Sequence, residues 1–327
     1  MGNRNTTHFQ NLKELPTPLS HSQCVLHKHE LLICGGVPQR ICYSYHTIKN
    51  EYKFICEYPR NVQLYGHCVV KLVDNNKDRS QITLLSFGSD WNRYSKHTLI
   101  MKYVSVWSDD NNNRNHPIII GRDNDDYIGA RALIGGINNH LLFITYLPKN
   151  ISVFDLKTFQ FIKHDTLPTN CIQYHCFVSK SENGQVQEMI KTNQKNKQNY
   201  QMLLFCEKTG LSIKYNEDNN AFQFQKLPVC DDIAPFYEYA YVCINDFILF
   251  FGGSNYPDVS KSVYKYSIRE NKWMTFQDTL PSPLRDCVAI LSEKDNDIHI
   301  IGGVNDKDIK VSSHMKTKVR AWDPSQL

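Results

Sequence analysis

Short apolar segments separated by polar turns follow one another along most of the chain. Residues 236–281 show this best: apolar runs at 239–244 and 247–251 are joined by Asn245-Asp246, and Gly252-Gly253 ends the second run. Two further runs, 262–268 and 272–277, follow across a polar turn. Runs of this length, bounded by turn residues, are typical of β-strands. The segment is therefore predicted to form four antiparallel strands in sequence.

The four-strand unit recurs, and its clearest mark is a pair of aromatic residues seven positions apart. The pairs are Tyr45 and Tyr52, Phe154 and Phe161, Tyr215 and Phe222, and Tyr266 and Trp273. A proline closes each of these units, at Pro59, Pro168, Pro228 and Pro281. Repeats of this length are typical of propellers and solenoids.

The repeat predicts an all-β fold, a six-bladed β-propeller of four-stranded antiparallel blades. The predicted blades are 17–59, 60–121, 122–168, 169–228, 229–281 and 282–327. In the second blade, Gly88-Ser89 is expected to end the second strand and 117–120 to form the fourth. In the last blade the third strand is predicted at 319–322, and no fourth strand follows it. At the N-terminus, Phe9 lies seven residues before Pro16, just as Tyr52 in a fourth strand lies seven residues before Pro59. Residues 8–14 are therefore predicted to complete the last blade, which closes the ring and removes a sheet edge. A short helix is expected only near 185–191, within a polar excursion at 181–199.

These features resemble the kelch-repeat family of β-propellers. The resemblance rests on strands ending in Gly-Gly (33–36, 250–253, 300–303), on the Tyr266-to-Trp273 spacing, and on Ala-Trp-Asp-Pro at 321–324. Thr145-Tyr146 and Cys206-Glu207 replace the glycines in units three and four. The resemblance implies a protein-interaction scaffold, such as a substrate-recognition module of a ubiquitin ligase or a cytoskeleton-associated module. Some kelch-type propellers are enzymes, among them copper radical oxidases and a sialic acid epimerase, so an enzyme with a site at the channel mouth is the alternative.

Charge and cysteine usage narrow the function classes. With 37 basic and 33 acidic residues the net charge is +4, and nucleic-acid binding is not expected. Eleven scattered cysteines and an N-terminus without an apolar signal segment favour free thiols, a cytoplasmic location and a monomer. Residues 1–6 match the M-G-x-x-x-[ST] pattern for myristoylation of Gly2. One acyl chain would give weak, reversible membrane contact; the alternative is a chance match.

Motifs that carry chemistry are missing from the sequence, which has no nucleophile elbow, P-loop or dinucleotide fingerprint. No catalytic residue, metal or cofactor is therefore predicted. Cysteines recur in the predicted first strands, where packing in the core explains them better than a metal cluster. The recurring positions are Cys24, Cys68, Cys176 and Cys287.

The predicted binding surface is the face that carries the loops between second and third strands and the loops between blades. Exposed Tyr, Trp and Arg side chains on rigid loops anchor protein interfaces. The loops between second and third strands supply Arg40, Trp91, Arg93, Tyr94, Tyr256 and Asp258. The loops between blades supply Arg60, Tyr65, Asp123, Asp125, Asp126, Tyr127, Asp231, Asp232, Tyr237 and Arg285. The acidic cluster 123–127 either receives a basic peptide or is a solvated turn. The basic run 191–197 is expected on the opposite face, as a solubilising loop or as a contact for nucleic acid or lipid.

Overall fold

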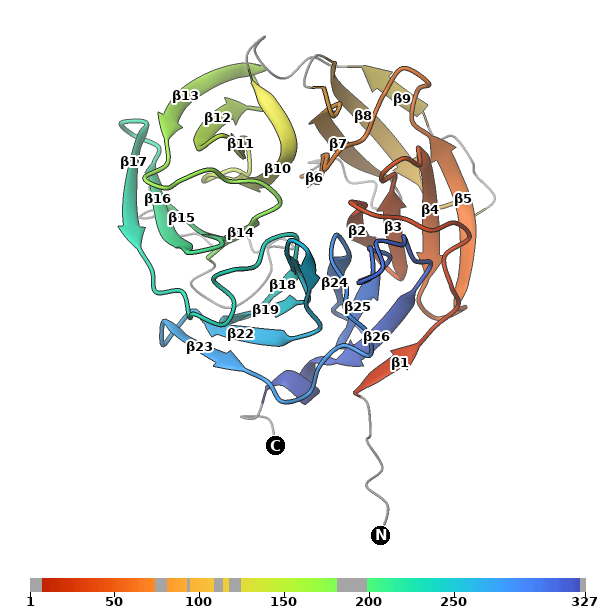
Figure 1. Cartoon of the computed structure of the whole chain (residues 1–327). Coiled ribbons are helices and arrows are strands. Elements are labelled where there is room, and N and C mark those ends of the chain that lie inside the picture. The colour runs from red at the N-terminus through yellow and green to blue at the C-terminus, as the bar shows by residue number, and fades with distance from the viewer. Residues whose placement is uncertain are drawn as a thin grey trace.

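Six four-stranded antiparallel sheets stand radially around a common centre (Figure 1). The computed structural model describes residues 8–73, 81–92, 95–108, 114–117, 125–180 and 199–323. The first three blades contain β2 (Gln23–His27), β3 (Glu30–Cys34), β4 (Ile41–His46) and β5 (Glu51–Glu57); β6 (Cys68–Leu72), β7 (Gln81–Ser89), β8 (Lys96–Val104) and β9 (Arg114–Pro117); and β10 (Asp126–Gly135), β11 (Leu141–Leu147), β12 (Asn150–Asp155) and β13 (Gln160–Thr166). The predicted fold class is confirmed.

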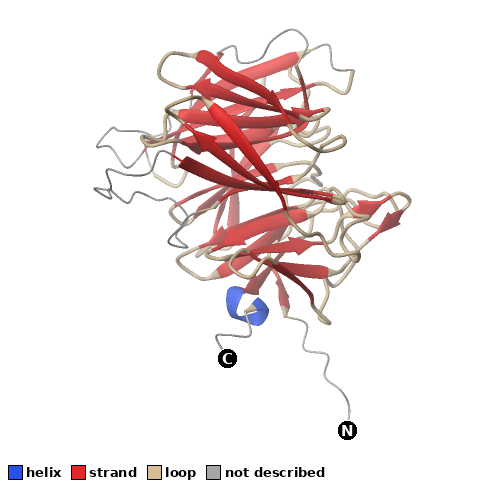
Figure 2. Ribbon diagram, turned by 90° about the vertical axis from the view of Figure 1, so that its left-hand side faces the viewer, coloured by secondary structure: helices blue, strands red, loops and turns tan. Residues whose placement is uncertain are grey.

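The other three blades follow the same order. They contain β14 (Cys176–Ser179), β15 (Asn199–Cys206), β16 (Thr209–Asn216) and β17 (Ala221–Lys226); β18 (Ala240–Ile244), β19 (Phe247–Phe251), β22 (Val263–Ser267) and β23 (Lys272–Thr275); and β24 (Val288–Ser292), β25 (Asp297–Ile301), β26 (His314–Lys318) and β1 (Phe9–Asn11). A small extra sheet of β20 (Ser254–Asn255) and β21 (Asp258–Val259) stands out on the right in Figure 2, which is the face turned to the viewer in Figure 1.

The aromatic pairs seven residues apart are direct cross-strand partners. Tyr266 pairs with Trp273 across the β22–β23 hairpin, and their ring centroids lie 5.0 Å apart. The turn between them needs a left-handed residue, which is Asn271 (φ 54°), and its side-chain oxygen accepts a hydrogen bond from Tyr266 at 3.0 Å. Asparagine tolerates this conformation better than most residues. The spacing therefore reports both the register and the turn of the outer hairpin.

Six large apolar clusters hold the blades together, one between each pair of neighbours, and they bury the side chains that alternate along the strands. The Gly-Gly pairs lie where a blade meets the next loop. Gly252 (φ +65°) passes so close to the carbonyl oxygen of Leu284 that an added Cβ would lie 2.1 Å from it. The amide of Gly253 donates to that same oxygen at 2.9 Å. Glycine is required there because the loop from the next blade crosses this strand end.

The ring is closed as predicted, by an N-terminal strand on the C-terminal blade. β1 pairs antiparallel with β26, with Phe9 opposite Thr317 and Asn11 opposite Met315. Phe9 is buried, and its ring lies 5.6 Å from that of Trp322. Both chain ends therefore meet at the same blade (Figure 1).

Two details of the strand prediction were wrong. Residues 319–322 form a short 3-10 helix, and the third strand of the last blade is β26, because its alternating residues Met315 and Thr317 fill the interior. In the second blade the fourth strand is β9, three residues earlier than predicted, whereas Gly88-Ser89 ends β7, as predicted. The helix expected near 185–191 lies outside the described residues.

The cysteines are free thiols. Burial raises the pKa of Cys24 and Cys287 to about 12 and that of Cys68 to about 11, so these first-strand thiols stay protonated and unreactive. Within the described ranges, no helix is long and apolar enough to span a bilayer.

Candidate binding site at the channel mouth

Every blade has one residue with positive φ at an equivalent position. This position lies two residues before the point where the first strand of the blade begins regular pairing with the second strand. Five of these residues lie in the loops that join the blades and Gly129 lies in the irregular start of β10; their φ values run from 50° to 64°. They are His21, Gly66, Gly129, Tyr174, Glu238 and Asp286.

Only two of the six are glycine, although glycine is the residue that adopts this conformation without strain. His21, Tyr174, Glu238 and Asp286 are held there by the surrounding loops. Such strained residues persist where the structure over-determines them, and they cluster at functional sites. The four non-glycine members, all bearing polar groups, are therefore the first candidates for a site.

Main-chain hydrogen bonds connect these residues from blade to blade. The amide of His21 donates to the carbonyl of Asp286 at 3.0 Å, and the amide of Asp286 donates to that of Glu238 at 2.9 Å. Across the ring, the amide of Tyr174 donates to the carbonyl of Gly129 at 3.0 Å. These bonds fix the backbone on which the functional side chains stand.

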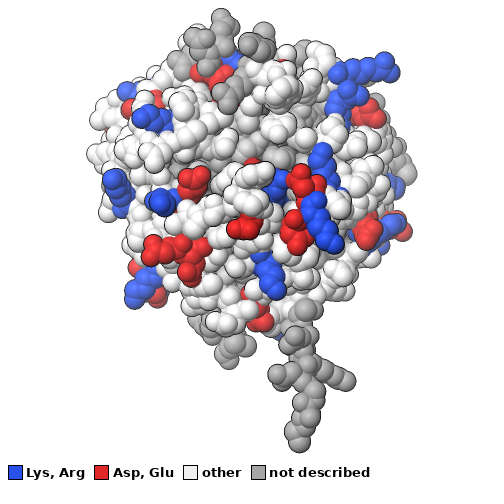
Figure 3. Space-filling view, viewed as in Figure 1, with Lys and Arg blue, Asp and Glu red and all other residues white. Residues whose placement is uncertain are grey.

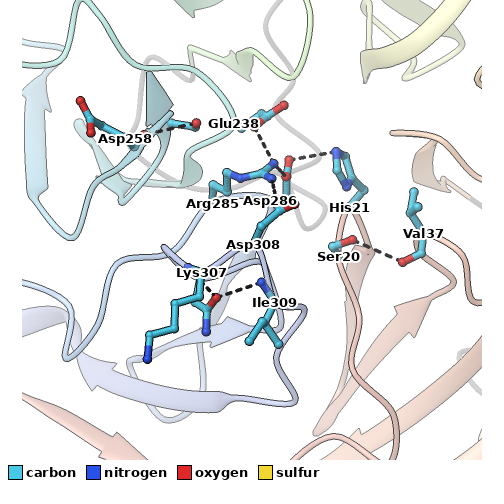
Figure 4. Close-up of polar contacts among 12 residues, drawn as sticks. Ser20, His21, Val37, Glu238, Asp258, Arg285, Asp286, Lys307, Asp308 and Ile309 are labelled. Carbon is cyan, nitrogen blue, oxygen red and sulfur yellow. Dashed lines mark hydrogen bonds and ion pairs between the residues drawn. The ribbon is translucent and has the colours of Figure 1, made fainter. Parts of the chain in front are cut away.

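Arg285 joins three acidic side chains at the channel mouth, those of Glu238, Asp286 and Asp308, into one network (Figure 4). Its Nη1 lies 2.6 Å from Asp286 Oδ2 and 3.2 Å from Glu238 Oε2, and its Nη2 lies 2.7 Å from Asp308 Oδ1. On the other side, His21 Nε2 lies 2.9 Å from Asp286 Oδ1. The carboxylate of Asp286 is thus shared between a guanidinium and an imidazole.

Glu238 has a pKa raised to about 7, chiefly because it is buried and further because Asp286 lies beside it; His21 and Arg285 oppose the shift. A carboxyl group with this pKa exchanges its proton near neutral pH, which is the property of a general acid or base. The mouth therefore contains a group that could take part in chemistry as well as in binding.

The side chain of Tyr174 packs over Gly66 and Gly129, the two glycines among the six positive-φ residues. A Cβ on Gly66 would lie 2.4 Å from the Tyr174 ring, and one on Gly129 would lie 3.1 Å from it, so only glycine leaves room for the ring. His21 packs against the same ring edge-on, with centroids 4.8 Å apart. The hydroxyl of Tyr174 is buried and has no hydrogen-bond partner among the residues that the structure describes. Burial, with Asp286 next in effect, raises the Tyr174 pKa, so the hydroxyl stays protonated as a donor.

These groups open on a cavity of about 170 Å³, which continues between the first strands of the blades. Arg131, on β10, and Tyr241, on β18, line it together with the mouth residues. For a metal ion, the candidate ligands among the described residues are His21, Glu238 and Asp286, whose ligand atoms lie within 4.8 Å of one another. Arg285 already occupies an oxygen of each carboxylate, which disfavours a cation there.

The binding residues predicted from sequence differ in exposure: some are exposed, some half-buried and some buried, and others lie outside the described residues. Trp91 and Tyr256 are exposed (64% and 86%), as are Arg60, Asp231, Asp232 and Asp258, while Tyr65 is 38% exposed and Arg40, Asp126, Tyr237 and Arg285 are half-buried. Arg93, Tyr94, Asp123, Gly2 and the run 191–197 lie outside the described residues. Of the predicted set, Arg285 belongs to the channel-mouth network.

Asp125 and Tyr127 are corrections to the predicted surface. Both are buried, because the carboxylate of Asp125 accepts hydrogen bonds from the hydroxyl groups of Tyr127 and Tyr146, each at 3.2 Å. This part of the acidic cluster is an internal support for blade three and offers no charge to a basic peptide. The neighbouring Asp126 caps the loop by accepting from the amide of Ile128 at 3.1 Å.

Sequence reasoning missed His21, Arg131, Tyr174, Glu238 and Asp286. The missed signal was positional: four of them stand at one offset before the first strand of their blade, where glycine stands in the other two. That offset could have been read once the blades were aligned with each other. Nothing in the sequence, however, indicates that one cavity collects them.

Comparison with known proteins supports the fold. No protein family matches the chain, and no curated protein is similar to it in sequence. Among solved structures, YjhT matches with a TM-score of 0.64 over 94% of this chain and 97% of its own, at 13% sequence identity. At this identity the likeness shows a shared propeller fold and carries no function.

Proposed function

We propose that the protein is a non-catalytic interaction module of the kelch type, which binds a partner protein on the face that carries the β19–β22 and β7–β8 loops. The observation that carries this proposal is Tyr256, which is 86% exposed at the tip of the β20–β21 hairpin. A large aromatic side chain on a rigid support suits an interface because little conformational entropy is lost when it is covered.

The hairpin that carries Tyr256 is tied to the body of the propeller. Ser254 pairs with Val259, and its backbone exchanges two hydrogen bonds with Tyr237 at 2.8 and 3.0 Å. Tyr237 is next to Glu238, so the hairpin adjoins the channel mouth. Trp91, 64% exposed in the β7–β8 loop, adds a second aromatic group on another blade. A partner that contacts both would cover the mouth between them.

The charge of this face supports a protein partner over nucleic acid. Acidic and basic side chains are interspersed in Figure 3, without a broad basic area of the kind that follows a phosphate backbone. The kelch resemblance would place such a module in a ubiquitin-ligase or cytoskeletal assembly.

Affinity capture from native lysate tests the proposal. We expect the wild type to retain one or more proteins that Trp91→Ala and Tyr256→Ala lose, while the thermal midpoint stays unchanged because both side chains are exposed. Ile48→Ala is the matched control, since Ile48 is 67% exposed in the β4–β5 turn at the opposite end of a blade. A captured set that is identical for all three variants would contradict the proposed face.

An enzyme with its site at the channel mouth is the second candidate, and the raised pKa of Glu238 beside His21 favours it. The resemblance names two chemistries, a copper oxidase and a sugar epimerase. Metal analysis of the purified protein tests the first, and bound copper would support it. An NMR screen of reducing sugars tests the second, and epimerisation by the wild type that Glu238→Gln abolishes would replace the non-catalytic proposal.

A further inference from the structure

Arg131 brings a positive charge into the channel cavity without a carboxylate beside it. It opens the regular pairing of β10 with β11, opposite Thr145, and it lines the cavity. Its Nη1 donates to the carbonyl of Ala130 at 2.9 Å, and no ion pair joins it to an acidic side chain within the described ranges. A guanidinium has five N–H donors, so most of them have no protein acceptor. Charged groups inside proteins are normally paired.

The positive charge of Arg131 affects the pKa values of two neighbouring residues, His175 and Tyr241. Burial lowers the pKa of His175, and the charge of Arg131 lowers it further. Burial raises the pKa of Tyr241, which Arg131 opposes.

Tyr174 provides a second, independent sign of a missing acceptor. It lines the same cavity, is 5% exposed, and its hydroxyl has no hydrogen-bond partner. Buried tyrosine hydroxyls are usually bonded, and an unsatisfied one is costly. Packing against Gly66, Gly129 and His21 holds the ring in place, so the hydroxyl cannot simply turn to solvent.

The acidic groups of the mouth do not neutralise Arg131, because they are engaged elsewhere. Asp286 is bound by Arg285 and His21, and Glu238 is bound by Arg285. The Tyr174 hydroxyl, and the N–H groups of Arg131 that have no acceptor among the described residues, therefore line a cavity whose carboxylates are already paired. The group that would complete this arrangement is an acceptor with negative charge.

We propose that the channel cavity binds a carboxylate, whose oxygens accept hydrogen bonds from the guanidinium of Arg131 and the hydroxyl of Tyr174. A cavity of about 170 Å³ compares with the roughly 150 Å³ that holds a benzene molecule, so the ligand has the size of a small organic acid. The carboxylate comes either from a free acid of that size or from an acidic side chain that a bound peptide inserts at the mouth. This proposal does not depend on the docking face proposed above.

Saturation-transfer NMR with defined probes tests the site. Lactate and succinate serve as free acids, and acetyl-Gly-Asp-Gly-amide serves as an acidic peptide; lactamide and the Asn tripeptide are their uncharged counterparts. We expect at least one acid to bind while its amide does not. Binding by the free acids alone assigns a small-molecule ligand, and binding by the Asp peptide alone assigns a side chain. Failure of every acid, or equal binding of acids and amides, overturns the proposal.

Variants distinguish this cavity from other sites on the molecule. Arg131→Gln should weaken binding of the acid at least about tenfold, the loss expected for a hydrogen bond to a charged group. Tyr174→Phe should weaken it several-fold while preserving the fold, because it removes an oxygen that has no protein partner. Arg269→Gln is the control, since this exposed arginine follows β22. Unchanged binding in Tyr174→Phe and in any folded Arg131→Gln protein, or an equal loss in Arg269→Gln, refutes the site.

Discussion

Tyr266 and Tyr174 are both buried, yet their hydroxyl groups are in opposite situations. The hydroxyl of Tyr266 donates to Asn271 at 3.0 Å in the β22–β23 turn, whereas that of Tyr174 has no partner. The first bond belongs to the repeat, because the same Tyr–Asn pair recurs as Tyr215 and Asn220 at 2.7 Å. The second hydroxyl belongs to one blade only. A side chain that serves the fold is satisfied within it, and one that serves a ligand need not be.

This difference predicts opposite responses to the same substitution. Tyr266→Phe should lower the free energy of unfolding by about 1 kcal/mol, the usual net value of a hydrogen bond. Tyr174→Phe should leave it unchanged or raise it by up to about 1 kcal/mol, because it removes an unsatisfied buried hydroxyl. Urea denaturation of the two variants measures both effects. An equal loss in the two proteins would show that the Tyr174 hydroxyl has a stabilising partner.

At the scale of elements, β1 decides whether the ring is closed. Beyond its pairing with β26, the amides of Leu12 and Leu15 donate to the carbonyls of His314 and Ser312 at 2.8 and 2.9 Å. Phe9 fills the space between the last two blades, beside Phe251 and Trp322. Without this strand, β26 would present unpaired backbone groups along an open edge.

Deletion of residues 1–14 should therefore do more than lower stability. Loss of Phe9 alone should cost about 3 kcal/mol or more, the usual result of removing a buried Phe side chain. The exposed edge of β26 should then cause self-association. Thermal denaturation and size-exclusion chromatography with light scattering measure the two effects. Deletion of residues 1–7, which precede β1, is the control, and equal behaviour of the two truncations would show that β1 is not the latch.

For the whole molecule, buried histidines set the response to acid. Burial lowers the pKa of His67 to about 3 and of His97 and His299 to about 4, and it holds those of His175 and His314 well below their ordinary value. These five residues lie in blades two, four and six or in the loops before them. In the folded protein they are neutral, whereas the unfolded chain takes up protons below about pH 6.5.

Stability should therefore be nearly constant between about pH 7 and 8 and fall as the pH drops from about 6.5 to 4. Each histidine contributes up to about 1.4 kcal/mol per pH unit in that window. Glu238 acts in the opposite sense, because its raised pKa adds stability at low pH that is lost as the pH rises to about 7, but it is one group against five. Denaturation midpoints measured across the window test this. His67→Gln should flatten the dependence, exposed His8→Gln should not, and a pH-independent midpoint would contradict it.

Local sequence was sufficient for the blades. The seven-residue aromatic spacing specifies a tight hairpin with one left-handed residue, an Asn in all but the Phe154–Phe161 hairpin, and Gly-Gly marks a strand end crossed by a neighbouring loop. The hairpin is a contact between residues close in the chain, whereas the glycine pair is visible in the sequence although the loop that crosses it, at Leu284, is distant. The third strand of the last blade was misplaced because His314–Lys318 looks polar by itself; only the apolar interior that its alternate side chains enter makes it a strand.

What the sequence by itself determined is the repeating unit, the number of blades and the strand that closes the ring, because each depends on turns and on alternation along the chain. What only the tertiary structure decided is which side chains share the channel mouth. His21, Tyr174, Glu238 and Asp286 come from four blades as much as 265 residues apart, and closure of the ring is what brings them together. The same closure buried Asp125 and Tyr127 and left Arg131 facing a cavity, because burial and pairing of charge depend on neighbours that are distant in the chain.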